Sequence, residues 1–65
     1  MAQLVIYPKQ AASITGNSYE AGKRLLQRIR ARLHKDARAY VSITEFCQYT
    51  GLPLHEVQAA LRTAA

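Results

Sequence analysis

A stripe of apolar residues in the middle of the chain constrains the fold most. Its members recur three and four residues apart, which places them on one side of an α-helix: Ala21, Gly22, Leu25, Leu26, Ile29 and Leu33. Ser18 stands just before the stripe, where a serine hydroxyl caps a helix N-terminus well. The spacing predicts an amphipathic helix from Ser18 to about Lys35, with its apolar side in a core.

The first part of the chain predicts a strand and a short helix before this one. Leu4 to Tyr7 is a short apolar, β-prone run that ends at Pro8. Pro8 fits the first position of a helix, and Gly16 fits its end.

A similar order follows the amphipathic helix. His34 to Ala39 lacks periodicity and predicts a connection, and Tyr40 to Ile43 predicts a second strand. Ser42 and Glu45 have the spacing of a capping box, which predicts a third helix ending at Gly51. Pro53 should start a fourth helix, whose expected buried face is Leu54, Val57, Ala60 and Leu61.

The two halves of the chain share this order at an offset of 35 residues, as Thr15-Gly16 and Thr50-Gly51 show. We therefore expect one domain over residues 1–65, mainly α with a small two-stranded sheet, in the order β-α-α-β-α-α. Pairing of the two strands in the middle would hold both helix pairs against one shared core.

Both halves also fit a helix-turn-helix pattern, in which a small residue precedes the turn glycine by four positions and an aliphatic residue follows it by six. The second half meets this test with Cys47, Gly51 and Val57. The first half has Ala12 and Gly16, but it has Gly22 where an aliphatic residue is expected. A helix-turn-helix-like frame is therefore expected.

Size and composition bound the remaining possibilities. A chain of 65 residues forms a small core, and its single Cys47 excludes an internal disulfide. A homodimer is therefore an expectation, formed if the free edge of the first strand pairs with its copy across a two-fold axis. The sequence has no secretory signal and no apolar run long enough to span a membrane, so we expect a cytoplasmic protein without membrane contact.

The chain offers little for catalysis. It has no glycine-rich phosphate loop, no paired carboxylates and no metal-ligand spacing, so we expect no enzyme, cofactor or metal site. His34 and His55 are expected to be solvated, and Cys47 to be a packed core thiol.

Charge is the feature that points to a partner. Nine Lys and Arg residues against four Asp and Glu residues give a formal net charge of +5 and a pI near 9.9. Seven of the basic residues lie between Lys23 and Arg38, with Asp36 as the one acid among them. The amphipathic helix has Glu20 as its single acid, at the N-terminus where the helix dipole favours it. A helix that is merely soluble normally interleaves acids at i, i+4, so this face favours a polyanion over simple solvation.

The predicted roles differ along the basic helix. Arg24, Arg28, Lys35 and Arg38 are long cations suited to phosphates. Lys23 and Gln27, nearer the helix start, are predicted to reach base edges, with Arg30 on the same flank as Lys23. Tyr19 has two predicted roles, contact with a phosphate or base and packing against the turn. Arg32 lies near the edge of the apolar side, where its guanidinium can extend over the core.

The order of these motifs gives a family resemblance. The chain has a strand, Tyr7-Pro8-Lys9, Thr15-Gly16, the basic helix, and then Glu45-Phe46-Cys47 and Thr50-Gly51-Leu52. Residues 7–33 resemble the front half of excisionase-like and MerR-like winged helix-turn-helix proteins, and the whole pattern is similar to short uncharacterised bacterial proteins of this length. The resemblance implies that the basic helix binds DNA, with Ser18, Tyr19, Lys23, Gln27 and Arg30 facing the groove. A winged family would continue with a β-hairpin, whereas this chain continues with one strand and another helix pair.

Two functions follow as hypotheses. In the first, the chain is a nucleic-acid-binding module that uses its basic helix on double-stranded DNA, with RNA left open, as a small transcriptional regulator or architectural factor. In the second, it is a protein–protein interaction module, antitoxin-like or adaptor-like, whose basic helix docks an acidic partner.

Overall fold

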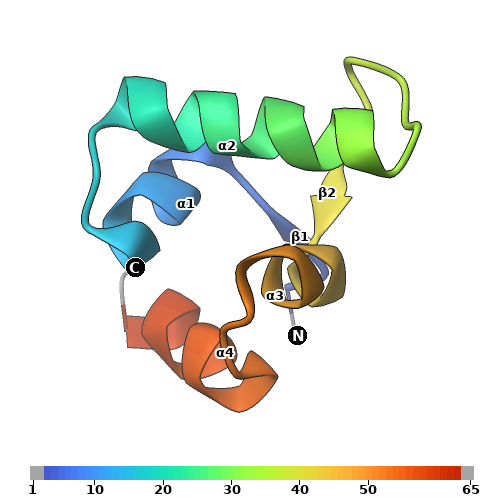
Figure 1. Cartoon of the computed structure of the whole chain (residues 1–65). Coiled ribbons are helices and arrows are strands. Elements are labelled where there is room, and N and C mark those ends of the chain that lie inside the picture. Colours follow the sequence, from blue (N-terminus) through green and yellow to red (C-terminus); the bar gives the residue numbers. More distant parts are fainter. Residues whose placement is uncertain (1–2, 64–65) are drawn as a thin grey trace.

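The computed structural model describes residues 3–63 and has the predicted order of elements (Figure 1). The two strands and four helices are β1 (Val5–Ile6), α1 (Pro8–Thr15), α2 (Tyr19–Arg32), β2 (Val41–Ser42), α3 (Ile43–Thr50) and α4 (Leu54–Thr63). The predicted fold class, mainly helical with a small two-stranded sheet, is confirmed. No helix among the described residues is long and apolar enough to cross a membrane.

The two strands pair with each other, as expected from the two-part order of the chain. β1 and β2 are antiparallel, with Val5 opposite Ser42 and Ile6 opposite Val41. The ladder continues by one bond, since the N–H of Ile43 donates to the carbonyl of Leu4 at 3.0 Å. In this register the backbone groups of alternate residues point away from the partner strand, towards the outer edges of the sheet.

The outer edge of β1 is closed by glutamine side chains. The Gln3 amide donates to the carbonyl of Val5 at 2.6 Å, and Gln10 Oε1 accepts from the N–H of Tyr7 at 3.1 Å. The two glutamines also bond to each other, Nε2 of Gln3 donating to Oε1 of Gln10 at 2.7 Å. Two outward-facing groups of this edge, the carbonyl of Val5 and the N–H of Tyr7, are therefore bonded within the chain.

At the outer edge of β2, backbone groups bond to the two members of an ion pair. Glu45 accepts from the N–H of Ser42 at 2.9 Å, and the Lys35 ammonium donates to the carbonyl of Tyr40 at 2.9 Å. Lys35 and Glu45 are themselves joined at 2.6 Å. Side chains therefore bond outward-facing backbone groups at both edges of the sheet, and the homodimer expected from the sequence stays a prediction.

The helix ends follow the predicted capping residues. Gly16 and Gly51 close α1 and α3 in the left-handed conformation, with φ of 72° and 78°. Ser42 and Glu45 form the predicted capping box at the start of α3, where the N–H of Glu45 donates to the Ser42 hydroxyl at 2.9 Å. Pro53 precedes α4 rather than beginning it.

α2 ends earlier than its apolar stripe predicts. Its last helical residue is Arg32, and His34 turns the chain out of the helix with a φ of 58°. The N–H of Lys35 then donates to the carbonyl of Arg30 at 2.8 Å and that of His34 to Ala31 at 3.2 Å, which is the Schellman pattern of helix termination. The predicted extension of the helix to Lys35 is therefore wrong, because this turn bonds the last carbonyls of α2.

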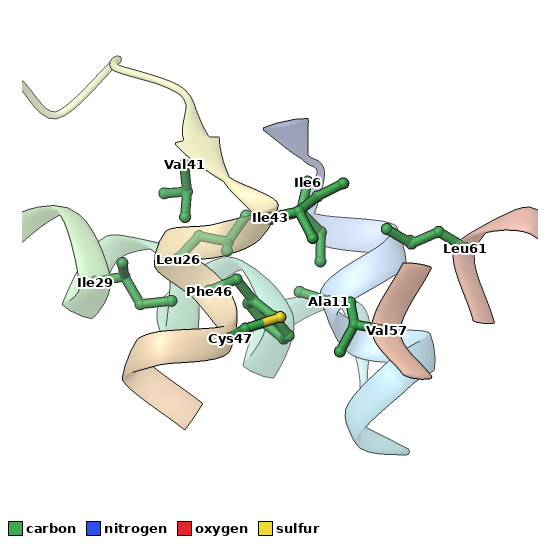
Figure 2. Close-up of a cluster of buried hydrophobic side chains, with 10 residues drawn as sticks. All are labelled: Ile6, Ala11, Leu26, Ile29, Val41, Ile43, Phe46, Cys47, Val57 and Leu61. Atoms are coloured by element: carbon green, nitrogen blue, oxygen red, sulfur yellow. The ribbon is translucent and has the colours of Figure 1, made fainter. Parts of the chain in front are cut away.

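One shared core joins the two halves (Figure 2). Phe46 of α3 is fully buried at its centre, and every strand and helix contributes to the cluster around it. The buried members are Ile6, Ala11, Leu26, Ile29, Val41, Ile43, Phe46, Cys47, Val57 and Leu61. Two residues predicted to be buried are exposed, Leu33 at 42% and Leu54 at 41%. Leu33 directly follows α2 and Leu54 begins α4, and at both positions no other part of the described chain covers the apolar side of the helix.

Candidate nucleic-acid interface

The N-terminus of α2 is held by its own cap. Ser18 is exposed, and its hydroxyl accepts from the N–H of Ala21 at 3.2 Å, as the sequence predicts for an N-cap. Glu20 lies in the first turn, where its charge complements the helix dipole. Tyr19 is 53% exposed at the first helical position, so its ring is available at the surface and does not pack fully against the turn.

Gly22 sets the orientation of α2 against α1. A Cβ atom at this position would lie 2.5 Å from the carbonyl oxygen of Pro8 and 2.8 Å from the backbone nitrogen of Ala12. These atoms belong to the backbone of α1, so no side-chain rotation makes room for a Cβ. Gly22 therefore stands in place of the expected aliphatic residue because the two helices approach too closely for a larger one. This close packing fixes which side of α2 faces solvent.

The outward side of α2 carries the predicted basic face. Lys23, Arg24, Gln27 and Arg28 are all exposed, and they recur three and four residues apart. Among residues 3–63, no hydrogen bond or ion pair engages the side chains of Lys23, Arg24 and Arg28. A polyanion would therefore meet cations that need not first leave another partner.

Arg30 and Lys35, two predicted contact residues, instead bond to the chain itself. The Arg30 guanidinium donates from Nε to the carbonyl of Ala39 at 2.7 Å, and its side chain is partly buried. Lys35 lies beyond the helix, paired with Glu45 and the carbonyl of Tyr40. The sequence predicts both as contacts of the basic helix, but each one joins the end of α2 to the segment that leads into β2.

Arg38 lies on the connection between α2 and β2, away from the helix. The connection is ordered by a turn in which Asp36 accepts from the N–H of Arg38 through Oδ1 and from the N–H of Ala39 through its carbonyl, both at 2.9 Å. The turn extends past the C-terminal end of α2 (Figure 1), and Arg38 is exposed on it. If Arg38 contacts a nucleic acid, it does so from the turn after α2 and not from the helix itself.

Arg32 was not among the residues predicted to bind, and its environment differs from that of the basic face. It is exposed and lines a shallow, solvent-open hollow between the end of α2 and α3, together with Leu33, Glu45, Gln48 and Tyr49. Leu33, the last apolar residue of the stripe, is the one feature of the sequence that relates to this hollow. The sequence predicts that Leu33 is buried, and the structure shows that it is exposed because α2 ends at Arg32.

Groups with catalytic chemistry are dispersed. His34 and His55 are exposed, as predicted, and Cys47 is buried in the core, where desolvation raises the pKa of its thiol. In the described part of the chain, no three His, Cys, Asp or Glu residues come together as metal ligands. The exposed residues of the second helix pair include Pro53, His55, Glu56, Gln58 and Arg62, a set with little positive charge.

Comparison with known proteins leaves these surfaces to be interpreted from their chemistry. No protein-family model matches the chain, and neither a curated protein nor a solved structure matches it significantly.

Proposed function

We propose that the chain is a small double-stranded-DNA-binding module that uses the outward face of α2. The observation that carries the proposal is the exposed, unpaired set of cations on one side of a single helix, with Glu20 as the only acid on that helix. α2 has 14 residues, so it is about 21 Å long, a length that fits within the major groove.

The contacts divide by chemistry. Arg24 and Arg28 are the proposed phosphate contacts on the helix, and Arg38 is a proposed phosphate contact from the adjacent turn. Lys23 and Gln27 are the proposed base contacts, because an ammonium and an amide offer groups that the major-groove edges of bases can pair with. Ser18 and Tyr19 lie at the start of the helix, where a phosphate would also meet free N–H groups. A role in transcription or DNA architecture is part of the same proposal.

Arg30 and Lys35 have a different role in this proposal. Their side chains hold the end of α2 and the following connection, so we expect them to support the binding face without touching DNA. Substitution of either residue should lower stability more than it changes affinity per folded molecule.

The test is a titration with random-sequence duplex DNA at several salt concentrations. About three phosphate contacts should give a slope of log K against log salt of about −2.7. Arg24→Ala with Arg28→Ala should weaken binding on all sequences and reduce the magnitude of the slope by about 1.8, while the circular dichroism spectrum stays unchanged. The matched control is Arg62→Ala on α4, which removes one exposed cation outside the proposed face and should leave the slope unchanged.

The alternative function, an interaction module whose basic helix docks an acidic protein, predicts a different result. It predicts no measurable DNA binding at low salt. The same outcome would remove the DNA proposal.

A further inference from the structure

A second surface of the chain differs from the basic face in composition. Leu33 and Tyr49 are each 42% exposed, and they lie in the hollow between the end of α2 and α3. Leu33 continues the apolar side of α2, and Tyr49 lies four residues after Glu45 on the facing side of α3. The hollow therefore has an aliphatic and an aromatic side chain whose apolar surfaces are open to water, and an apolar side chain of a partner could pack between them.

The charge around this hollow is positive. Arg32 and Glu45 both line it, but Glu45 is already neutralised by Lys35 at 2.6 Å. No described residue forms an ion pair or hydrogen bond with the Arg32 side chain. Arg28 is exposed one turn before Arg32 on the same helix. A partner that fills the hollow therefore gains most if it brings a carboxylate to Arg32.

A second copy of the chain is a poor source of that carboxylate. The whole chain has four Asp and Glu residues against nine Lys and Arg residues, and one of the four acids is Glu45 itself. Two such chains repel each other through their net charge of +5.

We propose that the hollow formed by Arg32, Leu33, Gln48 and Tyr49 docks an acidic amphipathic segment of another protein. The segment places an apolar side chain between Leu33 and Tyr49 and a carboxylate on the Arg32 guanidinium, and Gln48 offers an amide at the rim. The lining of the hollow does not include the proposed DNA contacts Lys23, Arg24 and Gln27, and Arg28 lies between the two surfaces on α2.

The experiment is selection from a displayed library of random 16-residue peptides on the full chain, in the absence of DNA. Peptides that bind the wild type but not Tyr49→Ala or Leu33→Ala should be enriched, with a net negative charge and two apolar residues three or four positions apart. Tyr49→Ala is expected to fold, because the side chain lies at the surface, and circular dichroism checks this. Enrichment of neutral or basic peptides, or of peptides that bind both variants as well as the wild type, overturns the proposal.

Charge reversal separates the docking site from general electrostatics. Arg32→Glu should weaken the selected peptides about tenfold or more, whereas Arg24→Glu, the same change on the proposed DNA face of the same helix, should have a much smaller effect. Equal loss in both variants overturns the proposal, and so does a wild-type dimer in light scattering that Tyr49→Ala abolishes. A DNA titration of Tyr49→Ala tests the proposed DNA binding separately from peptide docking. This variant should bind DNA like the wild type, because Tyr49 lies on α3 and not on the proposed DNA-binding face.

Discussion

Gly22 is the residue at which local preference and tertiary packing disagree. In an isolated helix, glycine is less favourable than alanine by about 1 kcal/mol, so a helix interior without other demands would not hold it. Here the space that a Cβ would need is occupied by the backbone of α1 at 2.5 Å and 2.8 Å. The close approach of α1 and α2 therefore outweighs helix propensity at this position.

We predict that Gly22→Ala destabilises the protein by about 1–3 kcal/mol or more, because the two helices must separate. Urea denaturation followed by circular dichroism measures the change. Ala31→Gly, on the exposed side of the same helix, serves as the control and should cost about 1 kcal/mol through propensity alone. A stabilised Gly22→Ala protein would show that α1 and α2 are not packed as described.

At the scale of the element, the third residue of α1 and the third residue of α3 have the same role. Each one caps its helix and also bonds the backbone beside the preceding strand. Gln10 and Glu45 are both at the third position of a helix, and each accepts from the backbone N–H of the helix cap, at 3.1 Å and 2.9 Å. Tyr7 directly follows β1 and Ser42 is the last residue of β2, so each capping bond also engages a backbone group at the edge of the sheet. Each helix thus bonds one backbone N–H at the end of the strand before it.

The Lys35–Glu45 pair makes this arrangement sensitive to acid. The hydrogen bond from Lys35, followed by the backbone bond from Ser42, lowers the pKa of Glu45 from its ordinary value of 4.5. A lowered pKa in the folded state means that the stabilisation is fully present above pH 4.5 and is lost as the pH falls through the lowered value.

We predict that Glu45→Gln lowers the free energy of unfolding by about 0.5–1 kcal/mol at pH 7 and that this difference shrinks as the pH falls through the lowered pKa of Glu45. Glutamine can still accept from Ser42, so the substitution removes the ion pair and keeps the cap. Urea denaturation from pH 3 to pH 7 measures this difference, and a double-mutant cycle with Lys35→Met isolates the pair. An effect that is constant across the pH range would mean that the ion pair contributes nothing.

At the scale of the whole molecule, stability depends on one core with Phe46 at its centre. All four helices and both strands contact the same cluster, so no half of the chain has a core of its own (Figure 2). A domain of this size has a stability of only about 3–5 kcal/mol from such a core. Loss of one large central side chain is comparable to that whole amount.

We predict that Phe46→Ala costs about 3–5 kcal/mol and leaves the chain largely unfolded at 25 °C. Tyr49→Ala, on the exposed side of the same helix, is the control and should cost less than about 1 kcal/mol. Thermal denaturation of both variants gives the comparison. A cooperative transition in Phe46→Ala close to that of the wild type would contradict the description of a single core.

The sequence alone determined the order of the elements, because the relevant signals are local. Helix caps, turn glycines and apolar spacing act within a few residues, and so Gly16, Ser18, Ser42 and Gly51 marked the helix ends correctly. The basic face of α2 was predictable for the same reason, since the exposed side of a helix follows once its apolar side is known.

The tertiary structure alone decided which of these residues are free. Arg30 and Lys35 bond to segments nine and ten residues further along the chain, and no local pattern indicates such contacts. Leu33 continues a correct apolar stripe, but whether it is buried depends on how far the core reaches, which only the packing of all six elements sets. The spacing of its residues therefore predicts the basic helix. Tertiary packing decides which of its cations are unpaired and which bond within the chain, and it also leaves the hollow beside Arg32 open.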